Sequence, residues 1–110
     1  MSQFITRIEL HAASERDYEI LRMKMLAIGF ASSIKADNGL EYQLPTAEFI
    51  IEGNYSLTQV YDLAERATRG TRRQNVILVV HSKGITFKLN EVQGRRIPDP
   101  VTPLTTALFT

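Results

Sequence analysis

Two histidines are the residues of this sequence best suited to acid-base chemistry on a phosphate. His11 and His81 lie near the ends of the first and last apolar, strand-like segments. Those segments are neighbours in the sheet predicted below, so we expect both histidines at one edge of it. Histidine is the commonest general base near neutral pH, and RNA cleavage needs a base, an acid and a cation. Both are candidate catalytic residues, although surface histidines at strand ends are the commoner reason for such a pattern.

A row of arginines is the strongest local feature. Arg66 and Arg69 are three residues apart on one face of a predicted helix, and Arg72 and Arg73 follow its end. Guanidinium groups bind phosphate through paired donors, so the row predicts an RNA-binding surface. Basic residues near a helix C-terminus also complement the helix dipole, and that structural role alone could account for two of them.

Charge is spread unevenly along the chain. Residues 1–65 carry five basic and ten acidic side chains, a net charge of −5, whereas residues 66–110 carry eight basic and two acidic, a net charge of +6. Such a cluster of cations favours a phosphate-bearing partner, and opposite faces that merely balance one another are the alternative. Tyr42, Tyr55 and Phe87 could stack on single-stranded bases, although aromatic residues beside a sheet more often belong to the core.

Other kinds of chemistry find little support in the sequence. The chain has no cysteine, which excludes disulfides, thiolate metal sites and cysteine nucleophiles and favours a reducing compartment. We expect no metal and no cofactor, because neither a histidine-rich or clustered-aspartate motif nor a glycine-rich phosphate loop is present. No segment reaches the roughly 20 apolar residues that cross a bilayer, so we expect a cytoplasmic protein that is not bound to a membrane.

The strands and helices that position these residues can be predicted from the sequence. Their order indicates one α+β domain of ferredoxin-like layout, βαββαβ, with two helices on one face of an antiparallel sheet. Apolar residues alternate along the predicted strands and recur at three- and four-residue steps along the predicted helices. Capping boxes at Ser14 and Ser56 mark the two helix starts. Strands are expected over residues 4–11, 30–36, 40–44, 48–53 and 76–80, and helices over 15–28 and 57–68.

Three local signals refine this layout. Asp37-Asn38-Gly39 predicts a hairpin turn, and Pro45 should interrupt the returning strand. The β-branched run over residues 76–80 is typical of a central strand buried on both faces. Residues 85–89 could add an edge strand. The domain is expected to span residues 1–90, and 91–110 to form an extended or disordered tail whose apolar end could dock in a groove.

Scattered positions in the first two thirds of the chain resemble the GhoS antitoxins, small ferredoxin-like proteins of type V toxin-antitoxin systems. The resemblance covers roughly residues 4–67 and fades through the second helix. The matching residues are Leu21, Arg22, Phe30, Ser32, Ser33, Ile34, Ala36, Asp37, Gly39, Gln43, Leu44 and Phe49.

The resemblance implies an endoribonuclease that cuts the messenger RNA of a membrane toxin, on a fold similar to the small CRISPR-associated ribonucleases. It makes Arg22 the leading site candidate, to hold and stabilise the phosphate while His11 or His81 transfers protons. The chain departs from the family at Leu10-His11-Ala12, where an acidic residue is expected, and in its tail. The alternative is a non-catalytic module that binds RNA or protein. A homodimer through a sheet edge is possible in either case.

Overall fold

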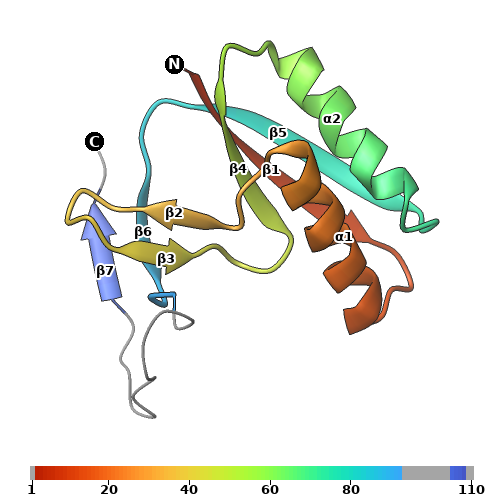
Figure 1. Cartoon of the computed structure of the whole chain (residues 1–110), viewed down its shortest axis with the longest axis horizontal. Helices are drawn as coiled ribbons and strands as arrows, with labels where there is room; N and C mark the ends of the chain where they lie inside the picture. Colours follow the sequence, from red (N-terminus) through yellow and green to blue (C-terminus); the bar gives the residue numbers. More distant parts are fainter. Residues whose placement is uncertain (1, 93–104, 109–110) are drawn as a thin grey trace.

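A computed structural model describes residues 2–92 and 105–108 of the 110-residue chain (Figure 1). It is a mixed α+β structure with two helices and a mainly antiparallel sheet, as the predicted ferredoxin-like layout requires. The elements in chain order are β1 (Ser2–Leu10), α1 (Glu15–Ile28), β2 (Ser33–Lys35), β3 (Glu41–Gln43), β4 (Glu48–Gly53), α2 (Leu57–Arg69), β5 (Asn75–Ser82), β6 (Thr86–Leu89) and β7 (Thr105–Leu108).

The main sheet has three strands in the order β4-β1-β5, and both pairings are antiparallel. The first and last core strands are therefore neighbours, as predicted. The prediction that residues 76–80 form a central strand is wrong, because β5 lies at the edge and β1 at the centre. Side chains of β5 alternate between the two faces of the sheet. Ile77 and Val79 pack against the main core, whereas Val76, Leu78 and Val80 are 53%, 58% and 45% exposed.

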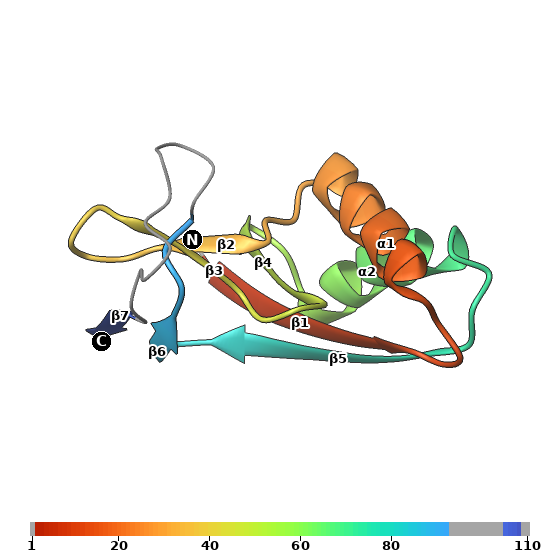
Figure 2. The same ribbon diagram turned by 90° about the horizontal axis from the view of Figure 1, so that it is seen from below.

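The two helices begin and end close to their predicted limits, because their signals are local. Ser14 and Ser56 each accept a hydrogen bond from the backbone of the third helical residue, whose side chain bonds back to the cap. Gly29 ends α1 with φ +122°, a conformation that glycine adopts easily. Both helices lie on the same side of the long strands β1 and β5 (Figure 2).

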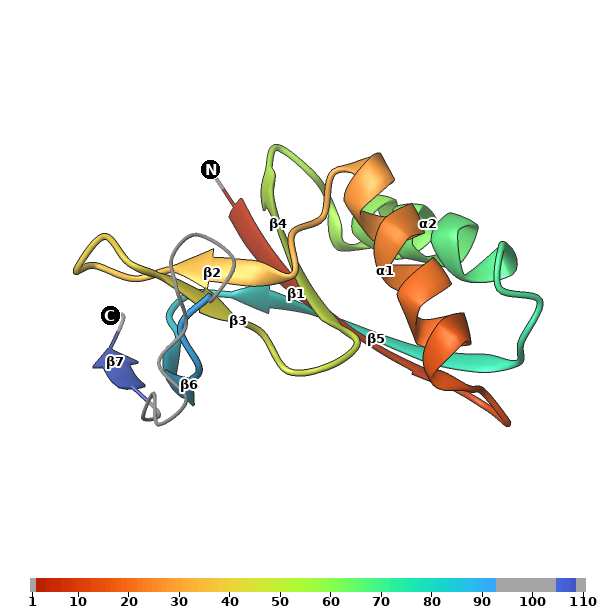
Figure 3. The same cartoon turned by 60° about the horizontal axis from the view of Figure 1, so that its bottom comes forward.

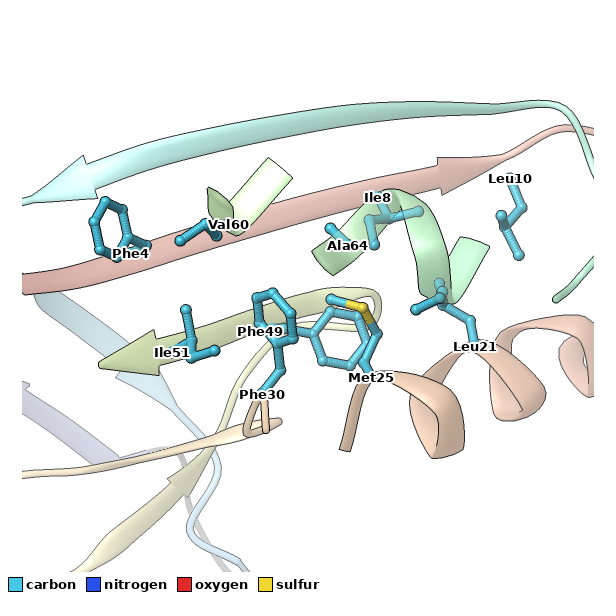
Figure 4. Packing of buried hydrophobic residues seen from close by; sticks show 11 residues of the cluster. Phe4, Ile8, Leu10, Leu21, Met25, Phe30, Phe49, Ile51, Val60 and Ala64 are labelled. Carbon is cyan, nitrogen blue, oxygen red and sulfur yellow. The ribbon is translucent and has the colours of Figure 1, made fainter. Parts of the chain in front are cut away.

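The main core fills the space between this sheet and the helices (Figure 4). β1 contributes Phe4, Ile8 and Leu10 from alternate positions, as the period of two along a strand predicts. Leu21 of α1 and Val60 of α2 are fully buried against them. Burial of this apolar stripe fixes the helices on the sheet, since each large side chain contributes about 1.5–3 kcal/mol when removed from water.

The β2–β3 hairpin forms where the Asp37-Asn38-Gly39 turn predicts it. Gly39 has φ +84°, and the Asn38 side chain accepts a hydrogen bond from the Leu40 N–H at 2.9 Å. Beyond Pro45 the chain resumes as β4, so the predicted interruption is confirmed. A bridge between Ala31 and Ile50 connects the start of the hairpin to the main sheet.

A second core lies beneath the hairpin. It is formed around the fully buried Tyr42 by Ile34, Ala36, Leu44 and Ile50. The Tyr42 ring tilts against Phe87 at 5.3 Å between centroids, and its hydroxyl accepts a hydrogen bond from the Asn38 amide. This core holds the hairpin to the end of the sheet that the helices leave uncovered.

The C-terminal strands lie at the end of the molecule away from the helices (Figure 3). The expected extra strand over residues 85–89 is present as β6, but it pairs with β7 rather than with the three-stranded sheet. Beyond β6, the Gln43 N–H bonds to the Asn90 carbonyl and the Val92 N–H to the Glu41 carbonyl. Within the predicted tail, residues 91, 92 and 105–108 are thus extended and paired, and the rest lies outside the described residues.

Candidate functional site

A hollow of about 720 Å³ lies where the start of β1, the end of β5 and the β2–β3 hairpin meet. We call it the His81 hollow, after a predicted site residue that lines it. Three basic side chains from two parts of the chain line it: Lys35 at the end of β2, and His81 and Lys83 at the end of β5 and just beyond it. Antiparallel pairing of β1 with β5 and folding of the hairpin onto the second core bring these segments together.

Local structure explains how Lys35 and His81 reach solvent. Lys35 follows the buried Ile34 in β2, so the alternation along a strand turns the lysine outward. His81 stacks on Phe4 of the neighbouring strand, with 4.9 Å between ring centroids and 24° between ring planes. Because Phe4 is itself held in the main core, this contact fixes the histidine ring while leaving the residue exposed.

Two carboxylates also line the His81 hollow. Glu52 accepts a hydrogen bond from the Gln3 side chain at 3.1 Å, and Asp37 belongs to the hairpin turn. The rim therefore offers both cations and hydrogen-bond acceptors. A phosphate would be drawn to the lysines, whereas a hydroxyl or an amino group could bond to a carboxylate.

The two predicted catalytic histidines are far apart. His81 lies opposite Phe4 in the β1–β5 register, whereas His11 follows the other end of β1 and donates its N–H to the Gln74 carbonyl at 2.8 Å. The seven residue steps along β1 from Phe4 to His11 span about 23 Å at the usual rise of a strand. The prediction that both histidines face one edge is wrong, because antiparallel neighbours place them at opposite ends of the sheet.

Arg22, the candidate from the family resemblance, lies in a different hollow of about 420 Å³, between α1 and the segment that connects β3 to β4. It is exposed on α1 and lies 3.6 Å from the Glu19 carboxylate. Glu15 and Glu48 line the same hollow. Three carboxylates around one guanidinium leave this surface negative, which disfavours a phosphate there.

The arginine row divides into paired and unpaired members. Arg69 contacts Glu65 at 2.7 Å and Arg73 contacts Asp17 at 3.1 Å, whereas Arg66 and Arg72 are exposed and make no ion pair within the described ranges. The hydrogen bond from Arg69 lowers the pKa of Glu65 below its usual value. Arg73 contributes to a lowered pKa at Asp17, whose main cause is the Ser14 backbone N–H.

Two of the three predicted stacking aromatics belong to the core. Tyr42 is fully buried and Phe87 packs on it, whereas Tyr55 is 37% exposed. Lys35 and Lys83 were missed by sequence reasoning. The alternation of side chains along the predicted strand indicates that Lys35 faces outward. Only the folded hairpin shows that Lys35 lines the same hollow as the end of β5.

The fold and this site define a ferredoxin-like α+β domain with a hollow at one end of its sheet, lined by two lysines, a histidine and two carboxylates. No protein-family model and no curated protein sequence matches the chain. Among residues 2–92 and 105–108, three or more His, Asp or Glu side chains nowhere gather closely enough to hold a metal ion. The same residues include no helix with the length and apolar character needed to cross a membrane.

Proposed function

We propose that this protein binds single-stranded RNA and that the His81 hollow holds the phosphate backbone. The observation that carries the proposal is that the β2–β3 hairpin brings Lys35 to the same hollow as His81 and Lys83 at the end of β5. Ammonium groups supply the long-range attraction that dominates binding to a phosphate backbone. Asp37 and Glu52 at the rim can accept hydrogen bonds from ribose 2′-hydroxyls, the groups that distinguish RNA from DNA.

Binding to a labelled single-stranded RNA, measured by fluorescence anisotropy over a range of salt concentrations, tests this site. Changing Lys35 and Lys83 together to Gln should weaken binding and make the slope of log affinity against log salt shallower by roughly 0.7 for each lost contact. The matched control changes Lys24 and Lys88 to Gln, which removes the same charge from exposed positions outside the hollow. Equal losses in both double variants would mean that the His81 hollow is not the site.

Cleavage of the bound RNA is a second candidate, favoured by the exposed histidine beside the two lysines. In this mechanism His81 accepts the proton of a ribose 2′-hydroxyl as the hydroxyl oxygen attacks the adjacent phosphorus, and the lysines stabilise the charge that develops on the phosphate. The 5′-oxygen leaves and takes a proton from water, which gives a cyclic phosphate and a 5′-hydroxyl. This is the activity that the likeness to the GhoS antitoxins implies, with toxin messenger RNA as the substrate.

An RNA cleavage assay distinguishes an enzymatic function from RNA binding alone. Purified protein is incubated with a panel of RNAs in the presence of a chelator, beside His81→Gln, His11→Gln and Arg22→Ala. We expect only His81→Gln to abolish cleavage, since neither His11 nor Arg22 lines the hollow. Binding without cleavage by the unaltered protein would leave the binding function and remove the enzymatic one. A small hydrophobic toxin encoded beside this protein would support the antitoxin role.

A further inference from the structure

β5 presents an open backbone edge. The His11 N–H bonds to the Gln74 carbonyl, so the backbone groups of Gln74 point toward β1. Since the direction alternates along an antiparallel strand, the N–H and C=O groups of Asn75, Ile77, Val79 and His81 point away from β1. No strand of the described residues pairs with that side, and Figure 2 shows β5 at the outer margin of the sheet.

This edge lacks the features that usually keep an edge strand from pairing. β5 contains no lysine, arginine, aspartate, glutamate or proline. Apolar side chains flank the edge on both faces of the sheet. On the uncovered face lie the exposed Val76, Leu78 and Val80, and on the helix face Leu57 and Tyr61 of α2 border a hollow of about 290 Å³ with Val79.

We propose that two copies of this chain pair through β5, antiparallel, about a two-fold axis at Leu78. A two-fold interface must complement itself, and the strand has the required symmetric pattern: five apolar residues, Val76–Val80, between polar ends at Asn75 and His81. With Leu78 opposite its own copy, Val76 faces Val80 and Ile77 faces Val79. Like faces then match, and the outward backbone groups of Ile77 and Val79 meet in hydrogen-bonded pairs.

Edge pairing explains the exposed residues better than face-to-face packing of two sheets. Packing through the uncovered face would cover Val76, Leu78 and Val80, but it would also bury Arg7 and Glu9, which lie opposite Leu78 and Val76 on β1. Removing such charges from water without good partners is costly. It would also leave Leu57 and Tyr61 in solvent. Pairing at the edge gives new apolar neighbours to the exposed residues on both faces of β5. It also leaves Arg7 and Glu9 of β1 in contact with water.

A single introduced cysteine tests the axis directly, because the chain has no cysteine of its own. On the axis, Leu78→Cys places two thiols in a directly opposed, non-hydrogen-bonded pair, within the range that a disulfide spans. Val76→Cys is the matched control, because it is similarly exposed on the same face but should lie about 13 Å from its own copy.

After mild oxidation we expect a disulfide dimer of Leu78→Cys and little of Val76→Cys. A mixture of Val76→Cys with Val80→Cys should cross-link, since those positions face one another across the axis. Cross-linking of Leu78→Cys that is no faster than that of Val76→Cys would overturn the proposal.

The mass of the protein in solution gives an independent test. Light scattering over a range of concentrations should show a dimer for the unaltered chain and a monomer for Leu78→Lys, where two lysines would oppose one another on the axis. Met23→Lys is the control, since Met23 is 62% exposed on α1, and this variant should stay dimeric. Circular dichroism checks that both variants are folded. An unaltered chain that stays monomeric up to its solubility limit would contradict the pairing, whether or not the protein binds RNA.

Discussion

At the scale of single residues, Thr6 is the clearest anomaly. It lies on the helix-facing side of β1, is fully buried, and its hydroxyl oxygen has no hydrogen-bond partner among the described residues. A buried polar group without a partner loses its bonds to water and gains nothing in return. We expect Thr6→Val to raise the free energy of unfolding by about 1 kcal/mol, measured by urea denaturation.

Thr68 provides the matched control for this change. It is also fully buried, but its hydroxyl donates a hydrogen bond to the Glu65 carbonyl at 2.8 Å. Thr68→Val should therefore leave stability unchanged or lower it. If Thr6→Val were as unfavourable as Thr68→Val, the hydroxyl of Thr6 would have to find a partner in solution.

The arginine row makes a second prediction at this scale. Arg66 and Arg72 are the members without an ion pair in the described part of the chain, so they are the ones free to meet phosphate. Changing both to Gln should move stability by only about 0.5 kcal/mol or less per site. RNA affinity should fall and its salt slope become shallower by roughly 0.7 per lost contact. An unchanged slope would identify the row as a solvated surface with two intramolecular pairs.

At the scale of elements, the two helix starts carry the same motif with one chemical difference. The reciprocal partner of Ser14 at α1 is Asp17, which titrates, whereas that of Ser56 at α2 is Gln59, which does not. The pKa of Asp17 lies below its ordinary value of 3.8, mainly because the Ser14 backbone donates to its carboxylate. A carboxyl with a lowered pKa stabilises the fold fully at higher pH and loses that contribution as the pH falls through its folded-state pKa.

The difference gives a pH-dependent prediction. Ser14→Ala and Ser56→Ala should each lower the free energy of unfolding by about 1 kcal/mol at neutral pH. The alanine variant keeps the backbone N–H of residue 14 but loses the hydrogen bond from the Ser14 hydroxyl to the Asp17 carboxylate. As the pH falls through the lowered pKa of Asp17, the part of the Ser14→Ala cost that comes from this bond should disappear, whereas the cost of Ser56→Ala should not change. Denaturant titrations at several pH values measure both. A parallel decline of the two costs would show that Asp17 does not set the acid sensitivity of α1.

Elements with local signals were the ones that the sequence could predict. The bounds predicted for α1 and β4 agree with the structure, because capping and apolar spacing are written within each segment. The run over residues 76–80 correctly indicates a strand, but not its place in the sheet. A continuous apolar run indicates that both faces of the strand favour burial. It does not show whether the residues that bury them belong to the same chain or to another copy. The proposed pairing of two β5 strands would supply part of this burial.

The site was harder to predict than the elements, since it depends on strand direction and register. His11 and His81 each lie at a strand end, and only the antiparallel β1–β5 pairing separates them. Lys35 and Lys83 are 48 positions apart in numbering and come together through the hairpin and the second core. No spacing rule within a single element contains that information.

At the scale of the whole molecule, the uneven charge of the chain is partly neutralised within the fold. The Arg69–Glu65 and Arg73–Asp17 pairs each join a cation from the basic part of the sequence to a carboxylate from the acidic part. In the proposed dimer, His81 of one copy lies opposite Asn75 of the other, only three residues from Arg72. Arg72 and the His81 hollow, which lie toward opposite ends of β5 in one copy, would then approach one another across the axis.

The central position of β1 also sets when the sheet can form during synthesis. β1 is made first, but its hydrogen-bond partners are β4 and β5, and β5 is the last strand of the main sheet. At about 5–20 residues per second, a ribosome needs about 2–8 s to pass from Leu10 to Glu48 and about 4–14 s to reach Ser82. Throughout that interval the apolar face of Phe4 and Ile8 has no finished sheet to join. Nascent chains that stop before β5 will keep one side of their central strand open.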